Sequence, residues 1–304
     1  MANGDHIEVT ESDQPSARPR LWRWILGTFI ILISWLALGA ILTAVFAGLF
    51  GLDLIALAST DKESLAIVRG YEPWRAATAV LVSFIPLLVI PILLHRYLLR
   101  QPLRNLFTRS NRNFSREVLL GAAVMSLLLL VSGIPDFIFN NSSYTWSFSA
   151  TKFIPYLVVA FTLIPIQTTA EEVFYRGWIQ QRLENGRRPI WLISILGGLL
   201  FALPHMGNPE VSGNLVLPIL GYGASGFMFS WVTMRDQSMG LAIGAHAANN
   251  ILAGLVVSSS DSALPAASIW VTPEVQWGPA AVVSVLLIPA FIWLTGKWRG
   301  KVAV

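Results

Sequence analysis

The sequence predicts an all-α fold, a polytopic bundle of about eight transmembrane helices with both termini in the cytoplasm. The prediction rests on composition, on long apolar stretches and on the placement of positive charge. Of the 304 residues, 54% are hydrophobic and 12% are charged, about half the roughly 25% of an ordinary soluble domain. A water-soluble fold of this size cannot bury so much apolar surface, so most soluble enzymes, disordered chains and collagens are excluded. The chain has no Cys, which excludes disulfide frameworks, thiolate metal sites and Cys nucleophiles.

Each expected span is a stretch of mostly apolar residues, of which a membrane helix needs about 20. The first and fourth stretches exceed one bilayer crossing, so we expect their ends to emerge or tilt. The first is also too long for a signal-peptide core, which indicates a retained helix. The eight stretches are 21–50, 74–98, 117–139, 153–182, 189–206, 214–234, 239–258 and 279–296.

Positive charge sets the orientation of these spans. Sixteen of the 21 Lys and Arg residues fall in alternate connecting segments and termini, four fall in the other connections, and Arg176 lies inside a span. Loops rich in Lys and Arg stay in the cytoplasm, so this split places both termini there. The net charge of +4 therefore indicates topology, and we expect a lipid bilayer rather than nucleic acid as the partner.

The sequence divides the chain into four segments. Residues 1–20 are polar and read as a disordered cytoplasmic tail, and 21–149 hold the N-terminal transmembrane helices. Residues 150–258 form a core whose spans carry polar side chains, and 259–304 form an external loop and the last transmembrane helix.

The fourth span carries ionisable residues that lipid-facing positions reject. Glu171, Glu172 and Arg176 lie there, although one such group at the centre of a span costs roughly 2.5–3.5 kcal/mol on insertion scales. Glu172 and Arg176 are four residues apart, so they share a helix face and can form a pair. Glu171 is then the acid without a local partner, which makes it a candidate general base.

Two other spans of the core carry imidazole and amide groups. His205 ends the fifth span, and the seventh contains His246 and Asn250, four residues apart on one face. Each group also has a purely structural reading: Glu172 with Arg176 as a packing clamp, histidine as a satisfied core residue, Asn as an interhelical contact. Residues 167–182 are also polar enough to lie flat at the cytoplasmic interface. The occurrence of these groups on three spans at similar depth favours a shared cavity between mid-bilayer and the cytoplasmic side.

Three motifs, read in order, resemble the CAAX protease and bacteriocin-processing (CPBP) family of intramembrane proteases. The family includes type II prenyl-protein endopeptidases, and the resemblance covers about residues 150–258. The one unusual feature is Pro204, which directly precedes the motif histidine. The motifs are Glu171-Glu172-Val173-Phe174-Tyr175-Arg176, Phe201-Ala202-Leu203-Pro204-His205 and His246-Ala247-Ala248-Asn249-Asn250.

The resemblance implies roles for these residues in peptide-bond hydrolysis. Glu171 is expected to activate water with help from His205, and His246 and Asn250 to stabilise the oxyanion. Glu172 and Arg176 are expected to support them. The implied substrate is a membrane-associated peptide or protein, and the implied location is a bacterial plasma membrane.

Metal use stays open at this point. Members of the family are often called metalloproteases, and Glu171, His205 and His246 would give a zinc ion three ligands and an open position. A metal-free mechanism uses the same residues, and we favour it slightly because the chain has no His-Glu-x-x-His motif.

Two other functions are compatible with the pattern. The residues could form the polar core of a non-enzymatic membrane partner of the immunity or scaffold type. Membrane carboxylates and histidines also mark proton-coupled transporters, although the repeated halves typical of many transporters are not visible. We favour the protease because all three motifs occur in order.

Overall fold

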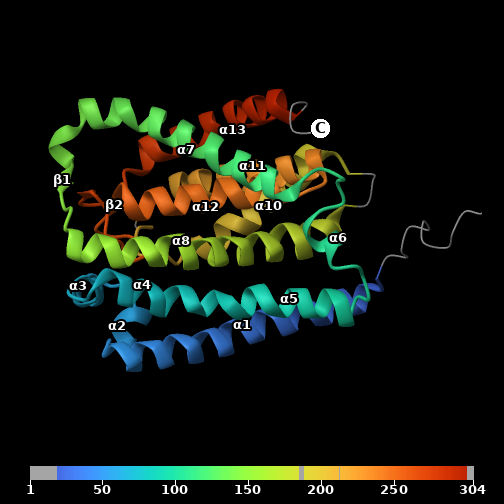
Figure 1. Ribbon diagram of the computed structural model, residues 1–304, viewed down its shortest axis with the longest axis horizontal. Helices are drawn as coiled ribbons and strands as arrows, with labels where there is room; N and C mark the ends of the chain where they lie inside the picture. Colours follow the sequence, from blue (N-terminus) through green and yellow to red (C-terminus); the bar gives the residue numbers. More distant parts are fainter. Residues whose placement is uncertain (1–18, 185–187, 212, 300–304) are drawn as a thin grey trace, which may run out of the picture.

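The computed structural model describes residues 19–184, 188–211 and 213–299, so the predicted tail lies almost wholly outside the described residues. The fold is an all-α bundle, as predicted (Figure 1). Within the described residues, six helical segments are long and apolar enough to cross a membrane. They are α1 (Leu21–Phe50), α4 with η2 and α5 (Pro73–Leu81, Val82–Phe84, Ile85–Tyr97), α7 (Phe114–Phe139), α8 with η4 and α9 (Ala150–Glu172, Val173–Gln180, Gln181–Leu183), α11 (Val216–Asp236) and α13 (Trp277–Arg299).

The other two expected spans are also helical but shorter. They are α10 (Ile190–His205) and α12 (Gly240–Leu255), with 16 residues each, below the roughly 20 that a full crossing needs. All eight predicted stretches thus contain a helix. Eight crossings and cytoplasmic termini stay predictions.

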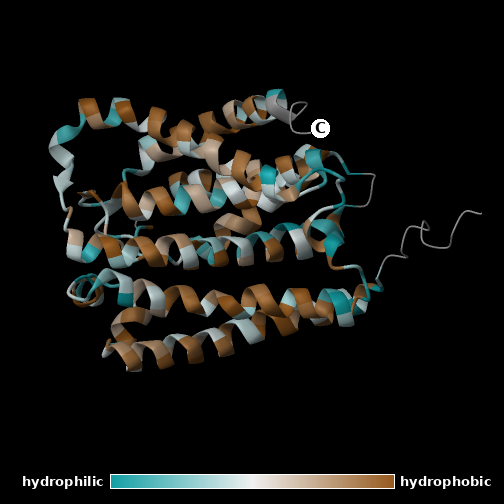
Figure 2. Cartoon of the chain, viewed as in Figure 1, coloured by the Kyte–Doolittle hydropathy of each residue, from teal (hydrophilic) through white to brown (hydrophobic). Residues whose placement is uncertain are grey.

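The long helices lie side by side in layers, with α1 at one edge, then α5, α8 and α12, and with α7 and α13 at the other edge (Figure 1). Apolar residues dominate their lengths, and hydrophilic residues gather toward the two ends of the bundle (Figure 2). Small residues allow some helices to approach closely: a methyl group on Gly244 of α12 would overlap the Val118 carbonyl of α7.

Segments predicted to be cytoplasmic lie at one end of the bundle. Helix α6 (Arg104–Phe107) is there, together with both ends of the described chain (Figure 1). The opposite end carries α2 (Leu54–Ala58), α3 (Lys62–Arg69), η3 (Asn141–Ser143) and the strands.

The connection 259–278, expected as a simple external loop, in fact contributes to a small sheet. Strands β1 (Thr145–Trp146), β2 (Val257–Ser259) and β3 (Trp270–Thr272) are ordered β1-β3-β2. Strand β1 pairs antiparallel with β3, and β2 pairs parallel with it. Aromatic and β-branched residues in β3 favour a strand, but its partners come from distant parts of the chain.

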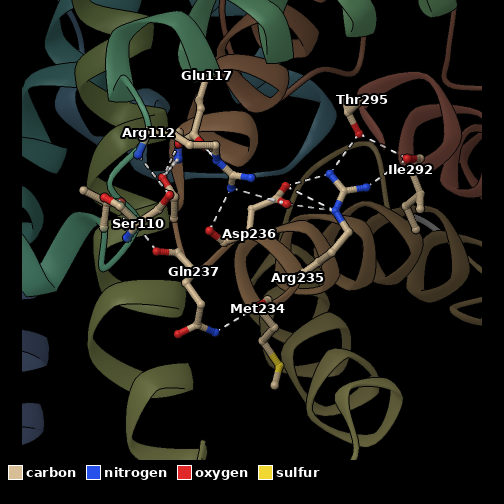
Figure 3. A network of polar contacts seen from close by, with 12 residues as sticks. Ser110, Arg112, Glu117, Met234, Arg235, Asp236, Gln237, Ile292 and Thr295 are labelled. Atoms are coloured by element: carbon tan, nitrogen blue, oxygen red, sulfur yellow. Dashed lines mark hydrogen bonds and ion pairs between the residues drawn. The ribbon is translucent and has the colours of Figure 1, made fainter. Parts of the chain in front are cut away.

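A network of charged groups ties three helices together at the end that holds α6 (Figure 3). We call Arg112, Glu117, Arg235 and Asp236 the end network. Arg112 Nε lies 2.7 Å from Glu117 Oε1, and Arg112 Nη2 lies 3.4 Å from Asp236 Oδ1. Arg235 pairs with Asp236 and donates to the Ile292 carbonyl of α13 at 2.9 Å. The network therefore joins α7, α11 and α13.

Candidate active site

The two adjacent glutamates lie where α8 changes its winding. Glu171 and Glu172 end α8, and the following segment η4 is a π-helix rather than the expected α-helix. π-Helical segments are rare in proteins overall, and those that occur are often found at functional sites. The predicted pair still forms, because Arg176 Nη1 lies 3.2 Å from Glu172 Oε1. Both side chains are 0% exposed, so they pack inside the helix bundle.

Arg176 is also held by α10 and α11. Its Nη2 donates a hydrogen bond to the Gly226 carbonyl at 2.9 Å. Its guanidinium carbon lies 4.9 Å from the centre of the Phe201 ring and 5.3 Å from that of Phe229. A methyl group on Gly226 would lie 2.7 Å from the Phe201 Cβ. The glycine therefore lets α10 and α11 pack closely enough to enclose the guanidinium.

His246 joins α12 to both glutamates. Its Nδ1 lies 2.9 Å from Glu172 Oε1, and its Nε2 lies 3.5 Å from Glu171 Oε2. The imidazole stacks on Phe229, with ring centres 5.1 Å apart. Glu171 Oε2 is buried and accepts no hydrogen bond from the described residues. The imidazole that faces Glu171 thus comes from another helix, 75 positions away in the sequence.

The Phe201 ring contacts both His205 and His246 and so connects His205 to this group. Its Nδ1 is 2.7 Å from the Phe201 carbonyl. Because a carbonyl only accepts, Nδ1 carries the hydrogen, and Nε2 of the neutral ring is an acceptor. The imidazole packs between Phe201 and Tyr222, at ring-centre distances of 4.7 and 4.3 Å. The helix runs through Pro204 and ends at His205, so the proline neither ends α10 early nor removes the histidine from the Phe201 ring.

Asn250 is tied to α8 rather than to His246. Its amide nitrogen donates to Gln167 Oε1 at 3.1 Å, and its oxygen accepts from Asn249 at 3.0 Å. Gln167 was not among the expected site residues. It precedes Glu171 by four positions and so shares its helix face, which is the sequence signal that could have identified it.

The predicted metal ligands do not form a ligand set. Among residues 19–184, 188–211 and 213–299, no three His, Cys, Asp or Glu side chains are placed to hold a metal ion. The two nitrogens of His246 face the two glutamates, and His205 Nδ1 donates to a carbonyl. These donors do not fit a zinc site.

A cavity lies outside the candidate site. It has a volume of about 390 Å³ and is lined by residues of α2, α3 and the segment 258–268, and none of the candidate site residues lines it. This cavity is therefore separate from the buried contacts between α8, η4, α10 and α12.

The buried group of Glu171, Glu172, Arg176 and His246 holds two acids, one guanidinium and one imidazole. Three of its buried atoms have no hydrogen-bond partner among the described residues: Glu171 Oε2, Glu172 Oε2 and Arg176 Nε. Buried polar atoms normally have a partner, so this group has spare capacity for a water molecule or a substrate.

Comparison with known proteins finds a match for the part of the chain that carries these residues. Residues 150–252 match the family model described as "Type II CAAX prenyl endopeptidase Rce1-like". The chain carries an Rce1-like segment. The resemblance predicted from the three motifs is thus confirmed, and the segment contains every candidate residue from Glu171 to Asn250.

One curated relative is similar over nearly the whole chain. It is the "Uncharacterized protein YyaK" of Bacillus subtilis (strain 168), 27% identical over 288 residues, which cover 92% of this chain and 94% of the relative. The Rce1-like segment together with six long apolar helices indicates an integral membrane protein. The same match supports a protease of the CAAX endopeptidase type.

Proposed function

We propose that this protein is an intramembrane endopeptidase of a bacterial plasma membrane, which hydrolyses a peptide bond in a membrane-associated peptide or protein. The observation that carries the proposal is the buried contact of His246 with both Glu171 and Glu172, at 3.5 and 2.9 Å. Within the Rce1-like segment, this contact brings together an imidazole and an acid whose Oε2 accepts no hydrogen bond from the described residues.

Glu171 and His205 act on the water in this proposal. Glu171 Oε2 has no donor among the described residues, so it can accept a hydrogen from a water molecule. His205 Nε2 is an acceptor because Nδ1–H is engaged by the Phe201 carbonyl. The water gives up a proton as its oxygen attacks the substrate carbonyl, and the proton later passes to the leaving amine.

His246 and Asn250 stabilise the oxyanion in this proposal. Glu172 accepts from His246 Nδ1 and holds the imidazole in place, as a carboxylate does for a catalytic imidazole. For His246 to donate to the oxyanion, Nε2 must carry a hydrogen as well. The Asn250 amide has two hydrogens and gives one to Gln167. The remaining one can be donated to a developing oxyanion. Glu172, Arg176 and Gln167 are positioning residues in this scheme.

The first test is cleavage by the purified protein in proteoliposomes that contain membrane-anchored peptides, in ¹⁸O-labelled water. Hydrolysis puts the label into the new carboxyl terminus, which mass spectrometry detects. We expect His205→Ala to be folded and to lose cleavage. Normal cleavage by His205→Ala would contradict its role, whereas proton-coupled flux by a wild-type protein without peptidase activity would favour a transporter.

A second test concerns metal. We expect chelation to leave cleavage unchanged and the purified protein to lack stoichiometric zinc, because the described His, Asp and Glu side chains do not form a ligand set. Stoichiometric zinc together with chelator-sensitive cleavage would overturn the metal-free mechanism.

A further inference from the structure

The orientation of the His205 imidazole is not fixed by its own helix. His205 is the last residue of α10 and is partly exposed, and the torsion about the Cβ–Cγ bond of a histidine has only a broad preference. Within α10, Nδ1 donates to the Phe201 carbonyl at 2.7 Å. The direction in which Nε2 points therefore depends also on contacts with other elements.

Tyr222 of α11 supplies such a contact. The centres of the Tyr222 and His205 rings are 4.3 Å apart, and their planes differ by 30°. Tyr222 also contacts Trp277 of α13, at a ring-centre distance of 5.2 Å. Aromatic contacts depend on the relative orientation of the rings, so the placement of the phenol ring affects how the imidazole is held.

Glu210, in the loop after α10, bonds both aromatic side chains of this contact. Its Oε1 accepts a hydrogen bond from the Tyr222 hydroxyl, and its backbone carbonyl accepts one from Trp277 Nε1 at 2.8 Å. Asn208 Nδ2 lies 2.9 Å from the same Oε1 and 3.2 Å from the Tyr222 oxygen. The other oxygen, Oε2, accepts from the Ala263 backbone N–H at 2.9 Å. The carboxylate thus uses both of its oxygens.

The burial of Glu210 makes these bonds strong. The residue is 8% exposed, and a buried carboxylate is tolerated where hydrogen-bond donors replace its lost water. Bonds to a charged acceptor are also stronger than bonds between neutral groups. Glu210 therefore fastens the loop that follows His205 to α11, to α13 and to the segment around Ala263.

We propose that Glu210 is a positioning residue that acts on His205 through Tyr222. The carboxylate fixes the phenol hydroxyl, the phenol ring packs on the imidazole, and the imidazole is thereby held with Nε2 in one direction. The effect on catalysis rests on the proposed function, in which His205 helps to activate water. The structural effect, a Tyr222 ring held against His205, is independent of catalysis.

Nuclear magnetic resonance tests the structural effect. The chain has four histidines, so histidine-selective ¹³C labelling in detergent micelles gives few ring signals, and the signal missing from His205→Ala identifies His205. Nearby aromatic rings shift this signal. We expect Glu210→Ala, which keeps the Tyr222 ring but releases it, to move the His205 signal toward that of an exposed histidine.

The matched control is Glu274→Ala, which removes an exposed glutamate whose carboxylate accepts from Gln276. It should leave the His205 signal in place, and the His95 signal should stay unchanged in both variants if the fold is kept. An unmoved His205 signal in Glu210→Ala would overturn the positioning role. If Glu210→Ala does not fold, the same signal in Tyr222→Phe decides the question, because that variant keeps the ring and removes the bond to Glu210.

The effect on catalysis is tested by cleavage. We expect Tyr222→Phe to lower kcat per folded molecule about tenfold with KM unchanged, equivalent to about 1.4 kcal/mol. The matched control is Tyr156→Phe, which removes a buried hydroxyl that has no hydrogen-bond partner among the described residues and should keep kcat. A hydroxyl that only stabilised the loop would change the amount of folded protein and leave kcat per folded molecule unchanged. Equal kcat values for the two variants would overturn the catalytic effect.

The two measurements separate the positioning role from the proposed function. If the wild-type protein cuts no peptide, the proposed function fails, and the His205 signal still decides whether Glu210 holds Tyr222 in place. If the wild-type protein cuts peptides and Glu210→Ala changes neither the His205 signal nor kcat, the proposed function stands and the positioning role is wrong.

Discussion

Two buried charged clusters of this protein differ in how fully their polar atoms are bonded. In the end network, Glu117 accepts from Arg112 at 2.7 Å through one oxygen and from the Ser238 hydroxyl through the other. Asp236 pairs with both arginines. None of the unpartnered buried atoms of the described residues belongs to this network, whereas three belong to the group around Glu171.

The difference separates a structural cluster from a candidate reactive one. A buried polar network in which every member is satisfied makes the packing more rigid and more specific. A buried carboxylate oxygen without a donor is destabilising unless something that the fold leaves room for binds it. We therefore expect changes in the end network to affect stability and changes around Glu171 to affect catalysis.

The largest effect is expected from Glu171→Gln, which removes the proposed base and keeps the shape of the side chain. Cleavage should fall by about 10²–10⁴-fold, the usual contribution of a general acid or base. Peptide cleavage in proteoliposomes measures the effect, and thermal unfolding in detergent should stay close to that of the wild type. The matched control is Glu117→Gln, the same substitution in the end network, which should keep cleavage per folded molecule. Equal losses of cleavage in both variants would show that the end network and the group around Glu171 do not differ in their importance for catalysis.

The second effect is expected from Asn250→Ala, which deletes a proposed oxyanion donor. Loss of one such donor typically lowers kcat by about 10²–10³-fold, with a smaller change in KM. The control is Asn249→Ala, because Asn249 donates to Asn250 and is given no direct role. If Asn249→Ala lowers kcat as much as Asn250→Ala, the oxyanion role is wrong.

A third effect concerns stability. Glu117→Gln replaces a charged acceptor of Arg112 with a neutral one, and hydrogen bonds to charged groups contribute about 1.5–3 kcal/mol. Because the Arg112 side chain is 16% exposed, we expect a loss near the lower end of that range. Reversible denaturation in mixed micelles measures the free energy of unfolding. An unchanged value would show that the end network does not act as a clamp.

The smallest effect is expected from Gln167→Ala, which frees the Asn250 amide. We expect kcat to fall about tenfold, equivalent to about 1.4 kcal/mol, because Asn250 is no longer held against α8. In the Asn250→Ala background the same substitution should change little, since neighbouring residues are not additive. Additive losses would mean that Gln167 acts independently of Asn250.

Contacts within one helix were the most predictable part of the site. The pairing of Glu172 with Arg176 follows from their four-residue spacing, and it is formed at 3.2 Å even though the segment between them is π-helical. Nothing in the sequence indicated that η4 would be a π-helix. Gln167 had such a signal, because it lies four residues before Glu171, and it was passed over.

Contacts between helices were predictable only in outline. The motifs placed Glu171, His205, His246 and Asn250 in one region, but not their pairings. His246 contacts the two glutamates, His205 donates to Phe201 on its own helix, and Asn250 donates to Gln167. Nothing in the spacing along the chain shows how far each helix is rotated about its axis.

The sequence by itself determined that this chain forms apolar helices and that a few polar groups lie within them, because helix length and helix faces depend only on local spacing. Tertiary structure decided which of those groups meet. Close approaches at Gly226 and Gly244 set the depth and rotation of neighbouring helices. As a result, Glu171 Oε2 accepts no hydrogen bond from the described residues, while both oxygens of Glu117 accept one.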